Sequence, residues 1–210
     1  MSKIDCLVVG YGGSGESYFM KKISEIININ DLRDRDGLKH MPHKTMINLI
    51  NKLKFKKNLK IIYVFSNPFK AICSLFRRGW GLIQYKKISK NKITKKQNYY
   101  LKNINNFLNF VDNEKTDLFS IQSHFYDWIA HSKYPIYFLD MENLDNEADN
   151  LKQFLNLNEM CQFNDWDCNK RSDYSNLILK HPNAVNLYNK LYDNMKKSAI
   201  THNNIVLQKN

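Results

Sequence analysis

The sequence predicts an α/β fold in which helices flank a mostly parallel central sheet. Three short apolar runs, at 4–9, 60–65 and 135–139, alternate with stretches whose apolar residues recur at helical spacing. Few glycines and prolines interrupt these stretches, and 210 residues with 43% hydrophobic content are enough to bury one core. We therefore expect a single domain over residues 1–210.

A glycine-rich turn follows the first predicted strand. Residues 10–17 read GYGGSGES and lead into a helix-like stretch at 18–27. The turn has the spacing of a phosphate-binding loop, G-x-x-x-x-G-K-[ST], between a strand and a helix. Its glycines permit positive φ angles, so successive N–H groups can point at an anion near the helix dipole. Glu16 stands where such loops have lysine, and a tight turn without a ligand is the alternative interpretation.

With the later elements, the sequence predicts a P-loop NTPase-like three-layer fold. The run at 60–65 is apolar at consecutive positions, as in a central parallel strand covered on both faces. It ends at Ser66-Asn67-Pro68, before a helix predicted over 69–78. Further helices are predicted over 124–131, 147–157 and 184–199, the first of them just before the strand at 135–139.

The charge of the chain indicates an anionic partner. A formal net charge of +12 favours nucleotides, nucleic acid, sulfated or phosphorylated substrates, or an acidic membrane surface. The Lys-rich segment at 85–103, with interspersed tyrosines, predicts a solvated loop or helix face, with polyanion binding as the alternative. Nucleic acid therefore stays open as a partner but is not favoured.

Cysteine usage and hydropathy indicate the compartment. Four cysteines without a CxxC pair or a Cys/His cluster predict a reducing environment, with no disulfide framework and no metal site. No window approaches the roughly 20 apolar residues of a membrane-spanning helix, and the first apolar stretch is too short for a secretory signal. We expect a cytoplasmic protein without a transmembrane segment.

Several segments, taken in order, resemble signatures of the sulfotransferase family. Residues 14–18, SGESY, align with S-G-T-T-W of its phosphosulfate loop, and residues 60–75, KIIYVFSNPFKAICSL, resemble K-I-I-Y-V-x-R-N-P-x-D-x-x-x-S. Residues 39–42, KHMP, are similar to K-T-H-L-P, and residues 136–145, IYFLDMENLD, to the strand and Y-E-D-L turn. A weaker match, at 169–172, has the place of a basic late loop. The resemblance covers most of the chain.

The resemblance implies a donor, a reaction and a set of site residues. The donor would be 3′-phosphoadenosine 5′-phosphosulfate, and the acceptor a hydroxyl, for which a glycan is one candidate. His40 would be the general base, with His43 as its competitor. The residues implied to bind the donor are Gly12, Gly13, Ser14, Gly15, Glu16, Ser17, Ser66, Ser74, Lys170 and Arg171. Arg77 and Arg78 are candidates to replace a missing arginine.

Three departures from the family keep other functions open. Gly13 replaces the loop lysine, Glu16 a threonine, and Ser66 the arginine before Asn-Pro. A degenerate, non-catalytic binding or scaffold module is the first alternative, and a divergent nucleotide kinase the second. For a functional site, we expect Glu16 to turn outward or to pair with a cation such as Lys21 or Arg171. We also expect Ser74 to face the same cavity as the glycine-rich loop.

Overall fold

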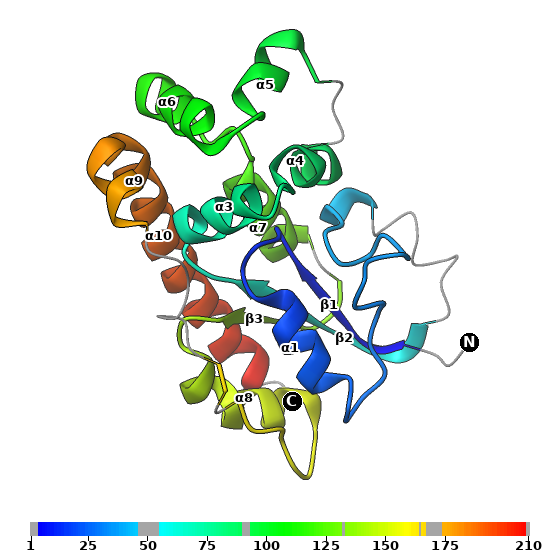
Figure 1. Cartoon of the computed structure of the whole chain (residues 1–210). Helices are drawn as coiled ribbons and strands as arrows, with labels where there is room; N and C mark the ends of the chain where they lie inside the picture. Colours follow the sequence, from blue (N-terminus) through cyan, green and yellow to red (C-terminus); the bar gives the residue numbers. More distant parts are fainter. Residues whose placement is uncertain are drawn as a thin grey trace.

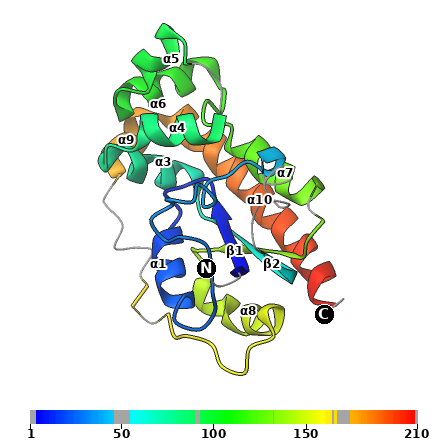
Figure 2. The same cartoon turned by 90° about the vertical axis from the view of Figure 1, so that its right-hand side faces the viewer.

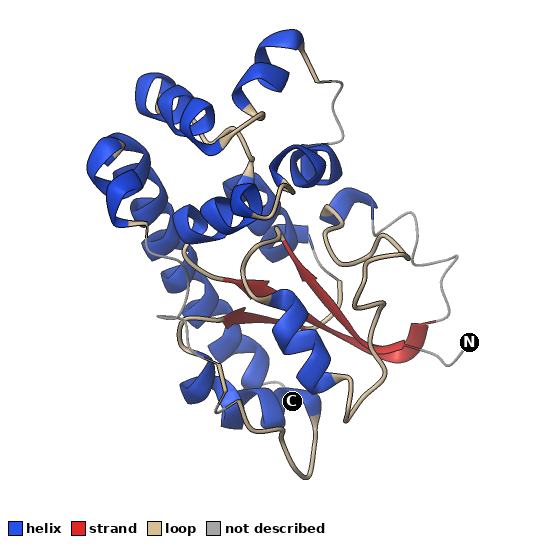
Figure 3. Ribbon diagram, in the orientation of Figure 1, coloured by secondary structure: helices blue, strands red, loops and turns tan. Residues whose placement is uncertain are grey.

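The chain forms a mixed α/β structure with a small parallel sheet among many helices (Figure 3). A computed structural model describes residues 4–45, 55–89, 93–131, 133–163, 165–166 and 174–208. The three strands of the sheet are ordered β1 (Ile4–Gly10), β2 (Phe55–Phe65) and β3 (Ile136–Asp140). Within the described part of the chain, no helix combines the length and the apolar character needed to cross a membrane.

The register of the strands explains their consecutive apolar residues. Both strand pairs are parallel, and Val8 lies beside Ile62, which lies beside Tyr137. These three residues belong to one buried cluster, whereas the next residues along two of the strands, Tyr63 and Phe138, belong to the other. Because alternate side chains enter cores on opposite faces, every position of the sheet must be apolar.

Helices cover both faces of the sheet, which confirms the predicted α/β architecture (Figures 1 and 2). On one face lie α1 (Glu16–Ile23) and α8 (Ala148–Leu155), the latter directly after a 3-10 turn at Leu144–Glu147. The other face is covered by α3 (Pro68–Arg77), α7 (Ile121–His131) and α10 (Pro182–Leu207).

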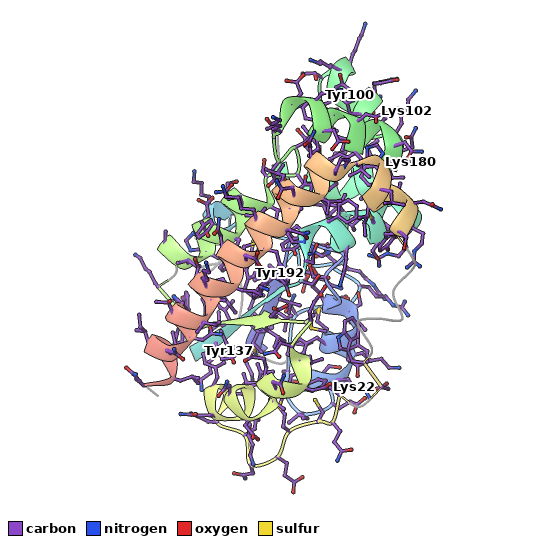
Figure 4. All side chains as sticks on the ribbon, turned by 90° about the vertical axis from the view of Figure 1, so that its left-hand side faces the viewer. Lys22, Tyr100, Lys102, Tyr137, Lys180 and Tyr192 are labelled. Carbon is purple, nitrogen blue, oxygen red and sulfur yellow. The ribbon has the colours of Figure 1, made fainter. Side chains whose placement is uncertain are left out.

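A group of shorter helices extends beyond the sheet. They are α4 (Gly81–Ser89), α5 (Lys95–Tyr100), α6 (Ile104–Glu114) and α9 (Ser175–Lys180). Figure 4 shows Tyr100, Lys102 and Lys180 at this end of the molecule. The prediction of a solvated segment at 85–103 is partly wrong, because Tyr85 and Ile88 on α4 are buried in the core. Residues 90–92 of that segment lie outside the described residues.

An asparagine side chain closes each edge of the sheet. At β1, the Val8 N–H donates to Asn30 Oδ1 at 2.7 Å, and Asn30 Nδ2 donates to the Val8 carbonyl at 3.0 Å. At β3, Asn203 of α10 forms the same pair of bonds with Phe138, both at 2.9 Å. A carboxamide presents an N–H donor and an acceptor oxygen side by side, so it satisfies a strand peptide as a further strand would.

Candidate anion-binding site

A cavity of about 620 Å³ opens where the glycine-rich loop joins β1 to α1. Helices α3 and α4, the segments 32–34 and 39–40, and Trp166 form the rest of its wall. Its lining includes eight residues singled out from the sequence: Gly13, Gly15, Glu16, Ser17, His40, Ser74, Arg77 and Arg78. The prediction that Ser74 shares a cavity with the loop is therefore confirmed.

The loop has the conformation that its glycines permit. Gly12, Gly13 and Gly15 have φ angles of 93°, 79° and 99°, in the region that residues with a Cβ rarely adopt. Space restricts them as well, because a Cβ on Gly13 would lie 2.4 Å from the Ala71 carbonyl oxygen of α3. The loop consequently holds its N–H groups in a tight turn before the first residue of α1.

The anion in this turn is the side chain of Glu16. Its Oε1 accepts the Gly12 N–H at 2.7 Å and its Oε2 accepts the Ser14 N–H at 3.0 Å. The side chain is 3% exposed. The prediction of an outward carboxylate is therefore wrong, since the loop amides need an acceptor and a carboxylate at the amino end of α1 also suits the helix dipole. Of the two cations expected as its partner, Lys21 is exposed on α1 and Arg171 lies outside the described residues.

Lys39 brings to the loop the cation that the loop's own sequence lacks. Its Nζ donates to Ser17 Oγ at 2.7 Å and to the Leu32 carbonyl at 3.2 Å. Burial lowers the pKa of the Lys39 ammonium, and the nearby Glu16 and Asp34 carboxylates oppose that shift. Sequence reasoning missed this residue, although it directly precedes His40, because a contact between positions 17 and 39 leaves no periodic signal.

His40 has a defined tautomer in the cavity. Its Nδ1 lies 2.9 Å from the Gly10 carbonyl oxygen, which can only accept, so Nδ1 carries a proton and Nε2 has the lone pair of the neutral ring. Burial lowers the pKa of His40, and the Glu16 carboxylate partly opposes this shift. The competing residue, His43, is buried with its ring edge against Trp128, at a centroid distance of 5.1 Å.

The predicted donor-binding residues divide into those on the cavity wall and those in the interior. Ser66 is fully buried, and its N–H contacts the Tyr11 hydroxyl at 3.2 Å. Gly12 and Ser14 are also buried, with their N–H groups on Glu16. The structure thus does not bring Ser66 to the cavity. Lys170 and Arg171 lie outside the described residues.

The described wall of the cavity is predominantly basic. Both carboxylates of the wall are already engaged: Asp34 forms an ion pair with Lys87, and Glu16 accepts a hydrogen bond from the loop. Arg78, directly after α3, follows Ser74 by one helical turn, and its Nε donates to the Ser74 carbonyl at 3.1 Å. The charged residues of the wall are Arg33, Lys39, Arg77, Arg78 and Lys87 against Glu16 and Asp34. This excess of positive charge attracts an anionic ligand.

Two tryptophans add apolar surface to the same cavity. Trp80 is 49% exposed, an unusual state for so large an aromatic side chain. Trp166 lies close to Gly15, donates its indole N–H to the Met141 carbonyl at 2.7 Å and has its ring 4.8 Å from that of Tyr18. The site can therefore hold a ligand that combines an anionic group with a flat or apolar one.

Comparison with protein-family models, with curated proteins and with solved structures finds no match to this chain.

Proposed function

We propose that this chain is a sulfotransferase-like P-loop protein, which binds 3′-phosphoadenosine 5′-phosphosulfate and transfers its sulfuryl group to an acceptor hydroxyl, with a glycan as one candidate acceptor. One observation carries the proposal: the loop, Ser74 and His40 share one cavity with five basic side chains. A donor with several negative charges and a purine ring suits a basic wall and an exposed Trp80 ring.

The residues present fit this donor at the wall of the cavity rather than inside the turn of the loop. Glu16 already accepts the N–H groups of Gly12 and Ser14, so these two donors are not open to a sulfuryl or phosphoryl oxygen. Outside the turn, Ser17 is exposed and accepts from Lys39, which leaves the serine O–H to donate. The anionic end of the donor is therefore expected at Ser17 and Lys39.

His40 is the base of the proposed transfer. The acceptor oxygen forms a bond to sulfur while the bond from sulfur to the bridging oxygen breaks, and adenosine 3′,5′-bisphosphate leaves. His40 Nε2 takes the hydroxyl proton, which requires the neutral ring that a lowered pKa favours at neutral pH. The cations of the wall stabilise the charge that develops on the leaving phosphate.

Thermal shift with three ligands tests the binding step. Adenosine 3′,5′-bisphosphate, ATP and inorganic sulfate are compared on the whole chain at equal ionic strength. A ligand at 100 times its Kd adds about 2.7 kcal/mol of apparent stability, and we expect selective stabilisation by the bisphosphate. Selectivity for ATP would instead indicate a nucleotide kinase, and the absence of any shift would contradict nucleotide binding.

A non-catalytic binding module is the second candidate function. The specific observation in its favour is the Glu16 carboxylate, which occupies the turn where a P-loop enzyme holds phosphate. Such a module would bind the bisphosphate without transferring a sulfuryl group.

Sulfuryl transfer by the wild type separates the two functions, and His40→Ala tests the proposed base. In an enzyme with an identified acceptor, the substitution should slow transfer by about 10²–10⁴ and leave bisphosphate affinity nearly unchanged, because a general base contributes to the chemical step alone. Labelled sulfate transfer and calorimetric titration give the two readouts. Equal turnover of wild type and variant would show that His40 is not the base.

A further inference from the structure

We propose that the rim of the anion-binding cavity docks on the surface of an anionic lipid bilayer. Exposed apolar side chains and exposed basic side chains lie together on this rim, and interfacial membrane binding uses both. The inference goes beyond the proposed function and does not depend on which nucleotide the cavity holds. The rim consists of Leu32, Arg33, Arg77, Arg78, Trp80 and Ile83.

Three large apolar side chains are exposed on the rim. Leu32 and Trp80 line the cavity, and Leu32 is 37% exposed. The Trp80 carbonyl accepts the Gln84 N–H at 2.8 Å, so Trp80 belongs to the first turn of α4. Ile83, which is 45% exposed, follows Trp80 by three positions and precedes the wall residue Lys87 by four. Because residues three and four apart share one side of a helix, Ile83 lies on the side of α4 that carries the wall residues.

An ion pair joins the two segments that carry these apolar side chains. Lys87 of α4 pairs with Asp34, whose side chain is largely buried. Asp34 Oδ1 also accepts the Lys39 N–H at 3.0 Å, which ties the segment to the cavity wall. Leu32 therefore belongs to the same surface as α4. A single exposed apolar residue needs no explanation, but several around one cavity mark an interaction surface.

Basic side chains surround the apolar part of the rim. Arg33 adjoins Leu32 in the sequence, Arg77 and Arg78 closely precede Trp80, and all three arginines are exposed. Asp31 and Asp36 are near Arg33 in the chain, but both accept backbone N–H groups of their own segment. The rim therefore attracts anionic headgroups, and each basic residue close to such a membrane strengthens binding about fivefold.

Aliphatic side chains distinguish a lipid surface from a nucleic acid as the partner. A nucleic acid offers phosphates to the arginines and bases to Trp80, but nothing that would cover Leu32 and Ile83. A bilayer takes up aliphatic side chains at the boundary between headgroups and acyl chains, and tryptophan at the level of the headgroups. An anionic bilayer therefore fits the rim better than a nucleic acid does.

Co-sedimentation of the whole chain with lipid vesicles tests the docking. Vesicles of phosphatidylcholine alone are compared with vesicles that also contain phosphatidylserine, and a single-stranded oligonucleotide is the second probe. The double variant Leu32→Ser, Ile83→Ser removes the aliphatic part of the rim. The matched control is Ile178→Ser, Leu179→Ser on α9, because these side chains are also exposed and aliphatic but lie outside the described wall of the cavity. Thermal melting of each variant shows that it is folded.

The wild type should bind the vesicles that contain phosphatidylserine, bind poorly to phosphatidylcholine alone and bind more weakly as salt is added. The rim variant should bind at least tenfold more weakly than the wild type, since each aliphatic side chain buried in lipid contributes roughly tenfold or more, and the α9 variant should bind as the wild type does. Unchanged binding of the rim variant would overturn the proposal, as would an equal loss in the α9 variant. A wild type that binds no vesicles would overturn it as well, whether or not it binds the oligonucleotide. Thermal shift with nucleotides contains no lipid, so these outcomes leave the proposed function standing.

Discussion

Gly13 is the loop residue where a side chain meets the closest obstacle. Gly13→Ala puts a Cβ 2.4 Å from the backbone oxygen of Ala71 and also requires a φ angle of 79°. Backbone oxygen cannot rotate away as a side chain does, so α3 or the loop must shift. We expect a loss of about 2–4 kcal/mol in the free energy of unfolding, measured by urea denaturation.

Gly37 provides the matched control. Its φ angle is 71°, but a Cβ there would meet nothing within 4 Å. Gly37→Ala should therefore show the backbone strain alone, about 1 kcal/mol. Equal losses in the two variants would contradict the steric conflict with α3.

His124 makes the stability of the fold depend on pH. Its Nδ1 lies 2.6 Å from the Tyr63 hydroxyl, and burial lowers the pKa of His124 to about 3. The unfolded chain takes up this proton near pH 6.5, the folded chain only near pH 3. Stability present above pH 6.5 is therefore lost as the pH falls through this window, by up to about 1.4 kcal/mol for each pH unit.

His124→Phe keeps an aromatic ring at this position and removes the titrating group. Its stability should be lower at pH 7, because the Tyr63 hydroxyl loses its partner. Its free energy of unfolding should also fall less steeply between pH 6.5 and 4 than that of the wild type. Urea denaturation at a series of pH values gives both slopes, and parallel curves would exclude His124 as the cause.

At the scale of elements, the edge of β3 depends on one side chain of α10. Asn203→Leu leaves the N–H and the carbonyl of Phe138 without the two bonds at 2.9 Å that join them to Asn203. Each unsatisfied buried group costs about 1–3 kcal/mol, so for the two groups we expect a loss of about 2–6 kcal/mol in chemical denaturation.

The neighbouring Asn204 is the control for this substitution. It is exposed on the same helix, so Asn204→Leu should change the free energy of unfolding by less than about 0.5 kcal/mol. A similar effect at both positions would show that α10 responds to the added leucine rather than to the lost edge bonds.

The elements that the sequence predicted well are those with an uninterrupted apolar pattern. The strand expected at 4–9 is β1 (Ile4–Gly10), and the tail helix expected at 184–199 is α10 (Pro182–Leu207). Helices α4, α5, α6 and α9 were missed, because lysine and asparagine interrupt the apolar pattern of several of them. In α6, buried residues at 107, 108 and 111 do recur at helical spacing, so that helix was open to prediction.

The parts of the site that the sheet positions could be predicted from the sequence. The parts that depend on the conformation of a loop could not. Ser74 in α3 and the glycine loop meet because α3 and the loop each follow the carboxyl end of one of two neighbouring parallel strands. Ser66 lies at such an end too, yet its peptide is engaged by Tyr11 in the interior. The Glu16 side chain points inward because the N–H groups of Gly12 and Ser14 donate to its carboxylate. No pattern in the sequence indicates that contact.

At the scale of the whole molecule, α10 holds the other elements together. This helix of 26 residues contacts β3, α3, α6, α7, α8 and α9. It contributes Tyr188, Leu191 and Met195 to the core, and its Tyr192 hydroxyl donates to Asp140 at the end of β3. Loss of α10 therefore removes buried surface from several elements at once.

A chain that ends at Lys180 should consequently not unfold cooperatively. Each large apolar side chain buried by α10 contributes about 1.5–3 kcal/mol, and their sum is comparable with the 5–15 kcal/mol that stabilises a typical domain. Thermal denaturation followed by circular dichroism checks this, with a chain ending at Gln208 as control. A sharp transition of the shorter chain at the control's Tm would contradict it.

The contacts of α10 also determine what happens while the protein is being made. Every element that α10 contacts is translated before it. At 5–20 residues per second, the 26 residues of α10 take roughly 1 to 5 s to synthesise. During that time the apolar surfaces of β3 and α3 that α10 buries are exposed. Yield in a host cell should therefore respond to the rate of translation and the supply of chaperones, independently of how stable the finished fold is.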